Sequence, residues 1–193
     1  MPHDQLEPSP FIARYAALIP ANARVLDLAA GSGRHARWLA ARGARVLAVD
    51  RDGAALAGFA GDPRIETRVV DLEADNWPLA GDSFGAIVVA NYLHRPLFPH
   101  LRAALAEDGV LLYETFAAGN ERFGRPSNPA FLLRDGELLQ LAAGPPQSLT
   151  VVAFEQGRDD SGGRTVVVAR LAAVGPAYPW PPMLVPTAAV QVA

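Results

Sequence analysis

The amino-acid sequence predicts an α/β fold with a doubly wound, mostly parallel, seven-stranded sheet. Short apolar runs alternate with stretches of helical spacing from residue 25 to residue 142. This alternation is typical of parallel sheets whose crossovers are helices. Two further apolar runs, Leu149–Phe154 and Thr165–Leu171, flank a segment rich in Gly and Asp. That pattern indicates a hairpin, so we expect an antiparallel edge at the C-terminal end of the sheet.

The first strand, turn, helix and strand carry the clearest signals. Val25–Leu28 is a short apolar run, Arg34–Arg42 has helical spacing, and Ala44–Val49 returns as a strand. Between the first two, Gly31 and Gly33 allow the backbone to turn tightly. Such a unit places the free N–H groups of a helix start beside the carboxyl end of a parallel strand. Nucleoside cofactors bind at such places.

The remaining elements follow from the same criteria. We expect a leading helix, three later helices, three more strands of the parallel part and one long loop. The helices are Phe11–Ile19, Asp52–Ala60, Pro96–Ala106 and Arg134–Ala142, the strands are Arg64–Val70, Phe84–Ala90 and Gly109–Glu114, and the loop is Thr115–Pro129. Loops of that length in compact domains are usually functional or disordered.

The domain organisation is simple. Residues 1–171 are expected to form a single domain, because 193 residues suit one core better than two. Residues 172–193 contain many prolines and no charged side chain. We expect an extended C-terminal tail there.

Composition excludes several classes of function. The formal net charge is −3, so a nucleic-acid partner is unlikely. The chain has no cysteine and no lysine, which excludes thiolate chemistry, Schiff bases and a P-loop lysine. No ligand cluster for a metal appears, and no signal peptide or 18-residue apolar span is found. We therefore expect a cytoplasmic protein with no metal and no membrane contact.

The residues around the glycine turn bear on the choice of cofactor. The GxGxxA pattern from Gly31 and the acid at Asp50 suit NAD and S-adenosylmethionine equally well. Asp27, just before the turn, would repel a pyrophosphate but attract the ammonium group of S-adenosylmethionine. Asp71 follows the third strand, where its carboxylate can accept a hydrogen bond from the adenine amine. These acids, the final hairpin and the absence of lysine favour S-adenosylmethionine.

On these residues the chain resembles the class I S-adenosylmethionine-dependent methyltransferases, a Rossmann-like family, over Val25–Leu171. The family signature acid-x-G-x-G-x-G is matched at Asp27, Gly31 and Gly33, whereas Ala29 replaces the first glycine. This methyl group is expected to be tolerated if the backbone φ at Ala29 stays negative. The blocks NYLHRPL and YETFAAGNERFGRPSNPAFLL look like a bacterial branch grouped with tellurite-resistance and thiopurine methyltransferases.

The resemblance implies roles for individual residues. Asp50 would bind both ribose hydroxyls, Asp71 with the Leu72 backbone would read adenine, and the methionine end would lie over the glycine turn. The cofactor would be S-adenosylmethionine, which leaves as S-adenosylhomocysteine. The full expected cofactor-binding set is Asp27, Ala29, Gly31, Ser32, Gly33, Asp50, Arg51, Asp71, Leu72 and Asn91.

The catalytic and acceptor-binding residues are harder to place. Methyl transfer from a sulfonium is an in-line displacement, so a base is needed only for a protonated acceptor. His94 and Tyr92, which follow the fourth strand, are the candidates, although His94 also suits a structural role in a turn. Acceptor contacts are expected from the end of the fifth strand and the long loop, at Tyr113, Arg122, Phe123, Arg125 and Asn128. The alternative is a solvated loop whose arginines pair with nearby glutamates.

The function that the sequence favours is methyl transfer from S-adenosylmethionine to a small acceptor, anionic or aromatic. Two alternatives stay open. One is a nicotinamide-dependent reductase on a Rossmann-like fold. The other is a non-enzymatic partner module that retains the methyltransferase fold. The identity of the acceptor and the oligomeric state do not follow from the sequence.

Overall fold

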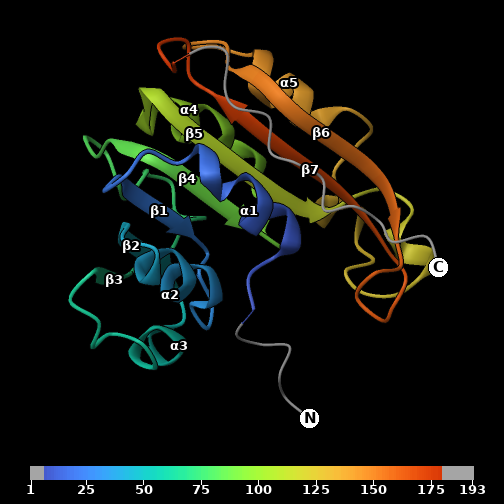
Figure 1. The fold of residues 1–193 in the computed structure, drawn as a ribbon. Coiled ribbons are helices and arrows are strands. Elements are labelled where there is room, and N and C mark those ends of the chain that lie inside the picture. Colours follow the sequence, from blue (N-terminus) through green and yellow to red (C-terminus); the bar gives the residue numbers. More distant parts are fainter. Residues whose placement is uncertain (1–6, 180–193) are drawn as a thin grey trace, which may run out of the picture.

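In the computed structural model, which describes residues 7–179, seven strands form one sheet in the order β3-β2-β1-β4-β5-β7-β6 (Figure 1). The first five strands are parallel, and β7 is antiparallel to both β5 and β6. The strands are β1 (Arg24–Leu28), β2 (Arg45–Asp50), β3 (Ile65–Val69), β4 (Phe84–Ala90), β5 (Leu105–Phe116), β6 (Thr150–Asp159) and β7 (Val166–Val174). The predicted mostly parallel sheet with an antiparallel C-terminal hairpin is confirmed.

The helices are short and lie on both faces of the sheet (Figure 1). The α-helices are α1 (Pro10–Tyr15), α2 (Arg34–Ala41), α3 (Gly53–Ala57), α4 (Phe98–Ala104) and α5 (Glu137–Ala143). Single 3-10 turns are η1 (Ala16–Leu18), η2 (Arg95–Leu97), η3 (Asn120–Arg122) and η4 (Pro129–Phe131).

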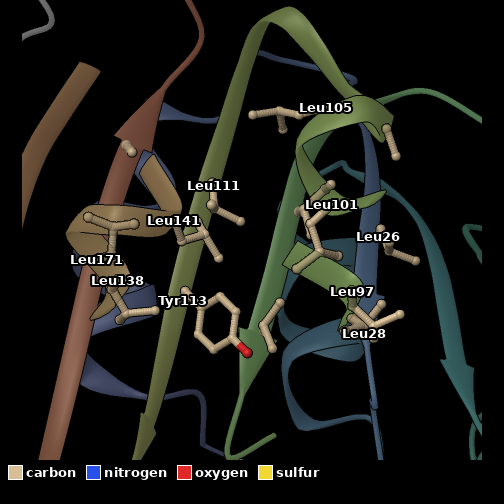
Figure 2. Close-up of a cluster of buried hydrophobic side chains, with 14 of the residues drawn as sticks. Leu26, Leu28, Leu97, Leu101, Leu105, Leu111, Tyr113, Leu138, Leu141 and Leu171 are labelled. Carbon is tan, nitrogen blue, oxygen red and sulfur yellow. The ribbon is translucent and has the colours of Figure 1, made fainter. Parts of the chain in front are cut away.

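Two apolar clusters hold the layers together. Helices α1, α2 and α3 cover one face, where Ile12, Leu39 and Leu56 are buried. Helices α4 and α5 cover the other face, and Figure 2 shows the leucines that gather there, among them Leu101 and Leu138. Because β2 and β4 are covered on both faces, their sequences are nearly continuous apolar runs.

The elements after β4 differ from the predicted boundaries. Strand β5 continues to Phe116, so the long loop starts two residues later than expected. That loop contains η3 and η4 and is anchored by Arg95, whose guanidinium donates to the Ala130 and Leu132 carbonyls at 2.8 Å each. The loop is therefore held against the domain by hydrogen bonds from this side chain to its backbone carbonyls.

The expected tail also begins too early. Residues 172–174 belong to β7 and are buried, because they pair with β5 and their side chains alternate between the two apolar clusters, Ala172 and Val174 on the α1 and α2 face and Ala173 on the other. Gly175 and Ala177 then donate backbone hydrogen bonds to Gly109 and Glu107. The rest of the expected tail, from residue 180, lies outside the described residues.

None of the helices in residues 7–179 has the length and hydrophobicity of a membrane-spanning segment. No group of three or more His, Cys, Asp or Glu side chains in that range is arranged to hold a metal ion.

Candidate active site

The turn between β1 and α2 has three residues in the left-handed region. Ala29, Gly31 and Gly33 have φ values of 54°, 52° and 74°. A Cβ on Gly33 would lie 2.5 Å from the Phe59 ring, so glycine is required there for packing as well as conformation. A Cβ on Gly31 would meet no heavy atom within 4 Å. The space over Gly31 is therefore open to a ligand.

Ala29 does not meet the condition stated for tolerating a methyl group. That condition was a negative φ, whereas the φ of Ala29 is positive. The next residue, Ala30, donates its N–H to the Val49 carbonyl at 3.0 Å, which ties the turn to the end of β2. The left-handed conformation of an alanine costs about 1–2 kcal/mol. The protein therefore carries backbone strain beside the pocket.

Asp50 ends β2 and holds the same turn. One of its carboxylate oxygens accepts from the Gly31 N–H at 2.8 Å, and the other accepts from the Asp52 N–H at 2.9 Å. A carboxylate offers about four acceptor positions. Each oxygen of Asp50 thus retains capacity for one further donor, such as a ribose hydroxyl.

A pocket of about 270 Å³ opens at the carboxyl ends of β1 to β4. Six of the ten expected cofactor-binding residues line it, together with Tyr92 and two residues that the sequence reasoning missed, Val70 and Glu73. The full lining is Ala29, Asp50, Arg51, Val70, Asp71, Leu72, Glu73, Asn91 and Tyr92. Val70 and Glu73 flank Asp71 and Leu72, so the adjacency in sequence was the available signal.

Asp27 does not line this pocket. Side chains alternate along a strand, and Leu26 and Leu28 belong to the cluster on the α4 and α5 face. Asp27 points to the α2 face, where its carboxylate accepts from the Ala36 N–H at 2.9 Å. Burial raises the pKa of Asp27 to about 7, against a lowering by that hydrogen bond. Its structural role is to hold the start of α2.

The other turn residues also lie behind the pocket or at its edge. Gly31, Ser32 and Gly33 shape the turn without lining the pocket. The exposed Ser32 offers its carbonyl to the Arg37 guanidinium at 2.7 Å.

The two candidate bases are placed differently. Tyr92 lines the pocket, and its hydroxyl donates to Glu73 at 3.5 Å. Burial, with the charge of Glu73, raises the pKa of Tyr92, so it is a hydrogen-bond donor rather than a base. His94 is half-buried at the start of η2, lines neither this pocket nor the cavity beside it, and makes no side-chain capping bond. A catalytic role for His94 stays a prediction.

Tyr113 was expected to face the acceptor and does not. Its ring is 1% exposed, lies inside the leucine-rich cluster (Figure 2) and packs edge-on against Phe98. Its hydroxyl donates to the Tyr92 carbonyl at 2.9 Å. Tyr113 supports the pocket from behind, because the inward face of β5 places it in the core.

A second, larger cavity of about 410 Å³ lies beside the first, and Asn91 lines both. The N-terminal segment at residues 7–10, the ends of β5 and β7 and the β6–β7 hairpin enclose it. Its charged lining residues are Glu7, Arg34, Glu114, Asp159, Arg164 and Arg170. The predicted acceptor residues Arg122, Phe123, Arg125 and Asn128 do not line it.

The loop residues have other roles. Asn128 accepts from the Ala130 N–H at 3.0 Å and caps η4, while Phe123 is 46% exposed. Arg122 and Arg125 are outside both cavities. These four loop residues therefore lie outside both cavities, whereas the hairpin turn and the N-terminal segment reach the larger cavity through the tertiary fold. A role of the loop in acceptor binding stays a prediction.

A buried polar network forms the wall of the larger cavity. Ser9 donates its N–H to His35 Nε2 at 3.1 Å and its hydroxyl to Glu114 Oε2 at 2.9 Å. Arg170 Nε also bonds Glu114 Oε2, at 2.5 Å, and its Nη2 bonds Asp159. Burial, with the charge of Arg34, lowers the pKa of His35 to about 3, so the ring is neutral and accepts from Ser9.

Parts of this chain are similar in sequence to known proteins. Residues 25–110 match the family described as a methyltransferase domain. A stretch of 93 residues is 39% identical to a demethylmenaquinone methyltransferase from Clavibacter sepedonicus, covering 46% of this chain and 37% of that protein. The chain thus spans little more than a third of this curated relative.

Solved structures extend the similarity to most of the chain. TehB from Haemophilus influenzae matches with a TM-score of 0.67 and 20% identity, over 83% of this chain and 60% of TehB. A 1,6-didemethyltoxoflavin-N1-methyltransferase from Burkholderia thailandensis, solved with 1,6-didemethyltoxoflavin and S-adenosylhomocysteine, matches with a TM-score of 0.65 and 22% identity, over 86% and 77%. The fold is that of the class I methyltransferases, so the expected resemblance to that class is confirmed, with TehB among the proteins of similar fold.

Proposed function

We propose that this chain, which carries a methyltransferase domain on the class I fold, transfers the methyl group of S-adenosylmethionine to a small-molecule acceptor. The observation that carries the proposal is the pocket at the ends of β1 to β4. There, Asp50 has unused acceptor capacity, and the space above Gly31 is open. Both features suit a nucleoside cofactor, and both lie within the residues that match the methyltransferase domain.

Different residues of the pocket bind different parts of the cofactor. Asp50 accepts hydrogen bonds from the two ribose hydroxyls with its remaining lone pairs. Asp71, exposed at the end of β3, accepts from the adenine amine, and the buried Leu72 packs beside the base. The glycine turn gives the methionine end room to approach the backbone. S-adenosylmethionine, when bound, supplies an electrophilic methyl group on a sulfonium.

Orientation is the main contribution of the protein to the reaction. Asn91 lines both cavities, so the junction beside it is where acceptor and methyl donor meet. Aligning two reactants in this way contributes on the order of 7–11 kcal/mol to lowering the barrier. Tyr92 remains protonated and closes the donor side of the junction. His94 remains the proposed base for an acceptor that arrives protonated.

The volume of the second cavity, about 410 Å³, lies within the usual range for pockets that bind small molecules. The cavity therefore suits a small-molecule acceptor. The Burkholderia thailandensis neighbour, named for the methylation of 1,6-didemethyltoxoflavin, offers a precedent on this fold. Cytoplasmic location and the absence of a nucleic-acid partner belong to the same proposal. The formal charge of −3 supports the latter.

Calorimetry with S-adenosylhomocysteine tests the proposal. We expect saturable binding to the wild-type protein and at least a hundredfold loss for Asp50→Ala, because two hydrogen bonds to a charged group disappear. Asp62→Ala changes a half-buried turn carboxylate outside the pocket and is the matched control. Absence of binding to the wild type, or equal binding by Asp50→Ala, would refute the proposal. Binding of NADH in its place would favour the reductase alternative.

A further inference from the structure

We infer that Glu114 binds the acceptor, and that the acceptor is a small molecule carrying an N–H donor and an anionic group, with its nitrogen as the methylated atom. This inference rests on the proposed function and names the substrate class of the same site. It depends on how charge is distributed around the larger cavity. Nothing in the sequence signature of the cofactor pocket bears on it.

Glu114 has one oxygen engaged and one free. Its Oε2 accepts from both the Ser9 hydroxyl and Arg170 Nε. Its Oε1 makes no hydrogen bond within residues 7–179 and keeps some solvent exposure, and the residue lines the cavity. Because it is accessible, this oxygen is available as a hydrogen-bond acceptor. An N–H of a ligand in the cavity would satisfy this one.

The charge balance beside Glu114 also favours such a donor. Arg170 is the single guanidinium that pairs with both Glu114 and Asp159. It also contacts the exposed Glu155, which pairs with Arg14 as well. Hydrogen bonds from Ser161 and Arg170 lower the pKa of Asp159 to about 2, so that carboxylate is ionised at neutral pH. This side of the cavity therefore carries one uncompensated negative charge. An amine or another N–H group compensates it better than an oxygen acceptor does.

Other parts of the lining carry the opposite charge. Arg34, at the start of α2, and Arg164, on the exposed hairpin turn, have no ion pair within the described part of the chain. The exposed carboxylate of Glu7 is the remaining charge of the lining. A carboxylate on the acceptor can pair with either arginine. The cavity thus combines an accessible acceptor for N–H with cations for an anion.

Glu114 is also tied to the methyl donor's pocket. Asn91 donates its backbone N–H to the Glu114 carbonyl at 2.9 Å, and Asn91 lines both cavities in the left-handed conformation, with φ of 56°. Residues held in this region cluster at functional sites. A nitrogen bound by Glu114 therefore lies at the end of the cavity that adjoins the cofactor pocket.

The transfer step follows from this placement. The lone pair of the acceptor nitrogen forms a bond to the methyl carbon while the bond between that carbon and sulfur breaks, and its electron pair stays on sulfur. The products are the N-methylated acceptor and S-adenosylhomocysteine. The proton that the nitrogen releases passes to Glu114 Oε1 and from there to water.

Binding of three simple probes to protein saturated with S-adenosylhomocysteine tests the inference. The probes are 4-(aminomethyl)benzoate, which carries both groups, benzylamine, which carries only the nitrogen, and 4-methylbenzoate, which carries only the anion. We expect the first to bind about tenfold more tightly than either of the others. Glu114→Gln should abolish its advantage over 4-methylbenzoate, because a hydrogen bond to a charged group is worth about tenfold in affinity. Arg164→Ala should reduce its advantage over benzylamine.

The controls separate this inference from folding and from the proposed function. Glu121→Gln alters an exposed carboxylate outside both cavities and should leave the probe affinities unchanged. An unchanged affinity for S-adenosylhomocysteine shows that Glu114→Gln is folded, and Arg164→Ala, on an exposed turn, tests the anionic group independently. Equal probe binding by wild type and Glu114→Gln, or no binding of the bifunctional probe, overturns the inference. Failure of S-adenosylhomocysteine to bind wild type refutes the proposed function instead.

Discussion

The two cavities that meet at Asn91 are built from contacts of very different range. In the cofactor pocket, Asp50 bonds Gly31 across 19 residues, and Asp27 holds the start of α2 across 9. In the wall of the larger cavity, Ser9 bonds Glu114 across 105 residues. One site is a local strand-turn-helix device, while the other exists only when distant segments meet. Cofactor recognition and acceptor recognition should therefore respond differently to mutation.

The largest expected effect breaks the local device itself. Gly33→Ala places a methyl group 2.5 Å from the Phe59 ring at a residue with φ of 74°. The left-handed conformation and the overlap together should lower the free energy of unfolding by about 2–5 kcal/mol. Denaturant titration measures this loss. A loss below 1 kcal/mol would contradict the packing argument.

Gly31→Ala is the matched comparison in the same turn. Its φ is also positive, but the added Cβ meets no heavy atom within 4 Å. We expect the smaller loss of stability, about 1–2 kcal/mol, from conformation alone. Affinity for S-adenosylhomocysteine should nevertheless fall, because the methyl group occupies the open space. A variant with unchanged affinity would argue against the placement of the methionine end.

The pH dependence of stability gives the next test, at Asp27 beside the cofactor pocket. The pKa of Asp27, raised to about 7 from its usual 3.8, lies above that in the unfolded chain. Between these values the folded protein keeps a proton that the unfolded chain has lost, so stability falls as pH rises from about 4 to 7. Asp27→Asn should remove this trend and stabilise the protein at pH 8 by about 2 kcal/mol. Thermal unfolding at pH 5 and pH 8 checks it.

Glu137, on α5, should show the opposite trend. Burial alone would raise its pKa, but hydrogen bonds from Arg95 and Arg134 outweigh burial and lower the pKa to about 2. The stabilisation is present above the usual pKa of 4.5 and is lost as pH falls from there towards 2. Glu137→Gln should cost about 2 kcal/mol at pH 7 and little at pH 2. An equal cost at both values would contradict the role of the ion pair.

The smallest effect concerns the strained alanine in the cofactor pocket. Ala29→Gly relieves a left-handed φ of 54°, and the entropy cost of glycine offsets part of the gain, so we expect a net stabilisation of about 0.5–1 kcal/mol. Asn22→Gly is the control, since Asn22 has a similar φ of 59° and asparagine tolerates that region. No stabilisation by Ala29→Gly beyond that of Asn22→Gly would contradict the assignment of strain.

Much of the fold and of the cofactor pocket follows from the sequence. The apolar runs of β2 and β4 identify strands covered on both faces, and Asp50, Asp71 and Leu72 lie where strand ends place them. Predictions that depended on the orientation of one side chain were less successful. Tyr113 and Asp27 are the examples, because strand alternation directs the first into the core and the second towards α2.

The acceptor side was the least predictable. The Thr115–Pro129 loop has the composition of a binding loop. The chain just after it is held in place, because the Arg95 guanidinium donates hydrogen bonds to the Ala130 and Leu132 carbonyls. The polar wall of the larger cavity comes instead from Ser9, Glu114 and Arg170, which lie in three separate parts of the chain. No local spacing rule connects them.

The sequence by itself therefore determined the class of fold, the glycine turn and the acids at the strand ends, because each depends on residues close together in the chain. The tertiary structure alone decided the left-handed conformation of Ala29 and the direction of Asp27. It also decided the free oxygen of Glu114, because pairing between distant strands sets which neighbours a side chain meets. Strand order and register carry that information, and they arise only when the whole sheet is assembled.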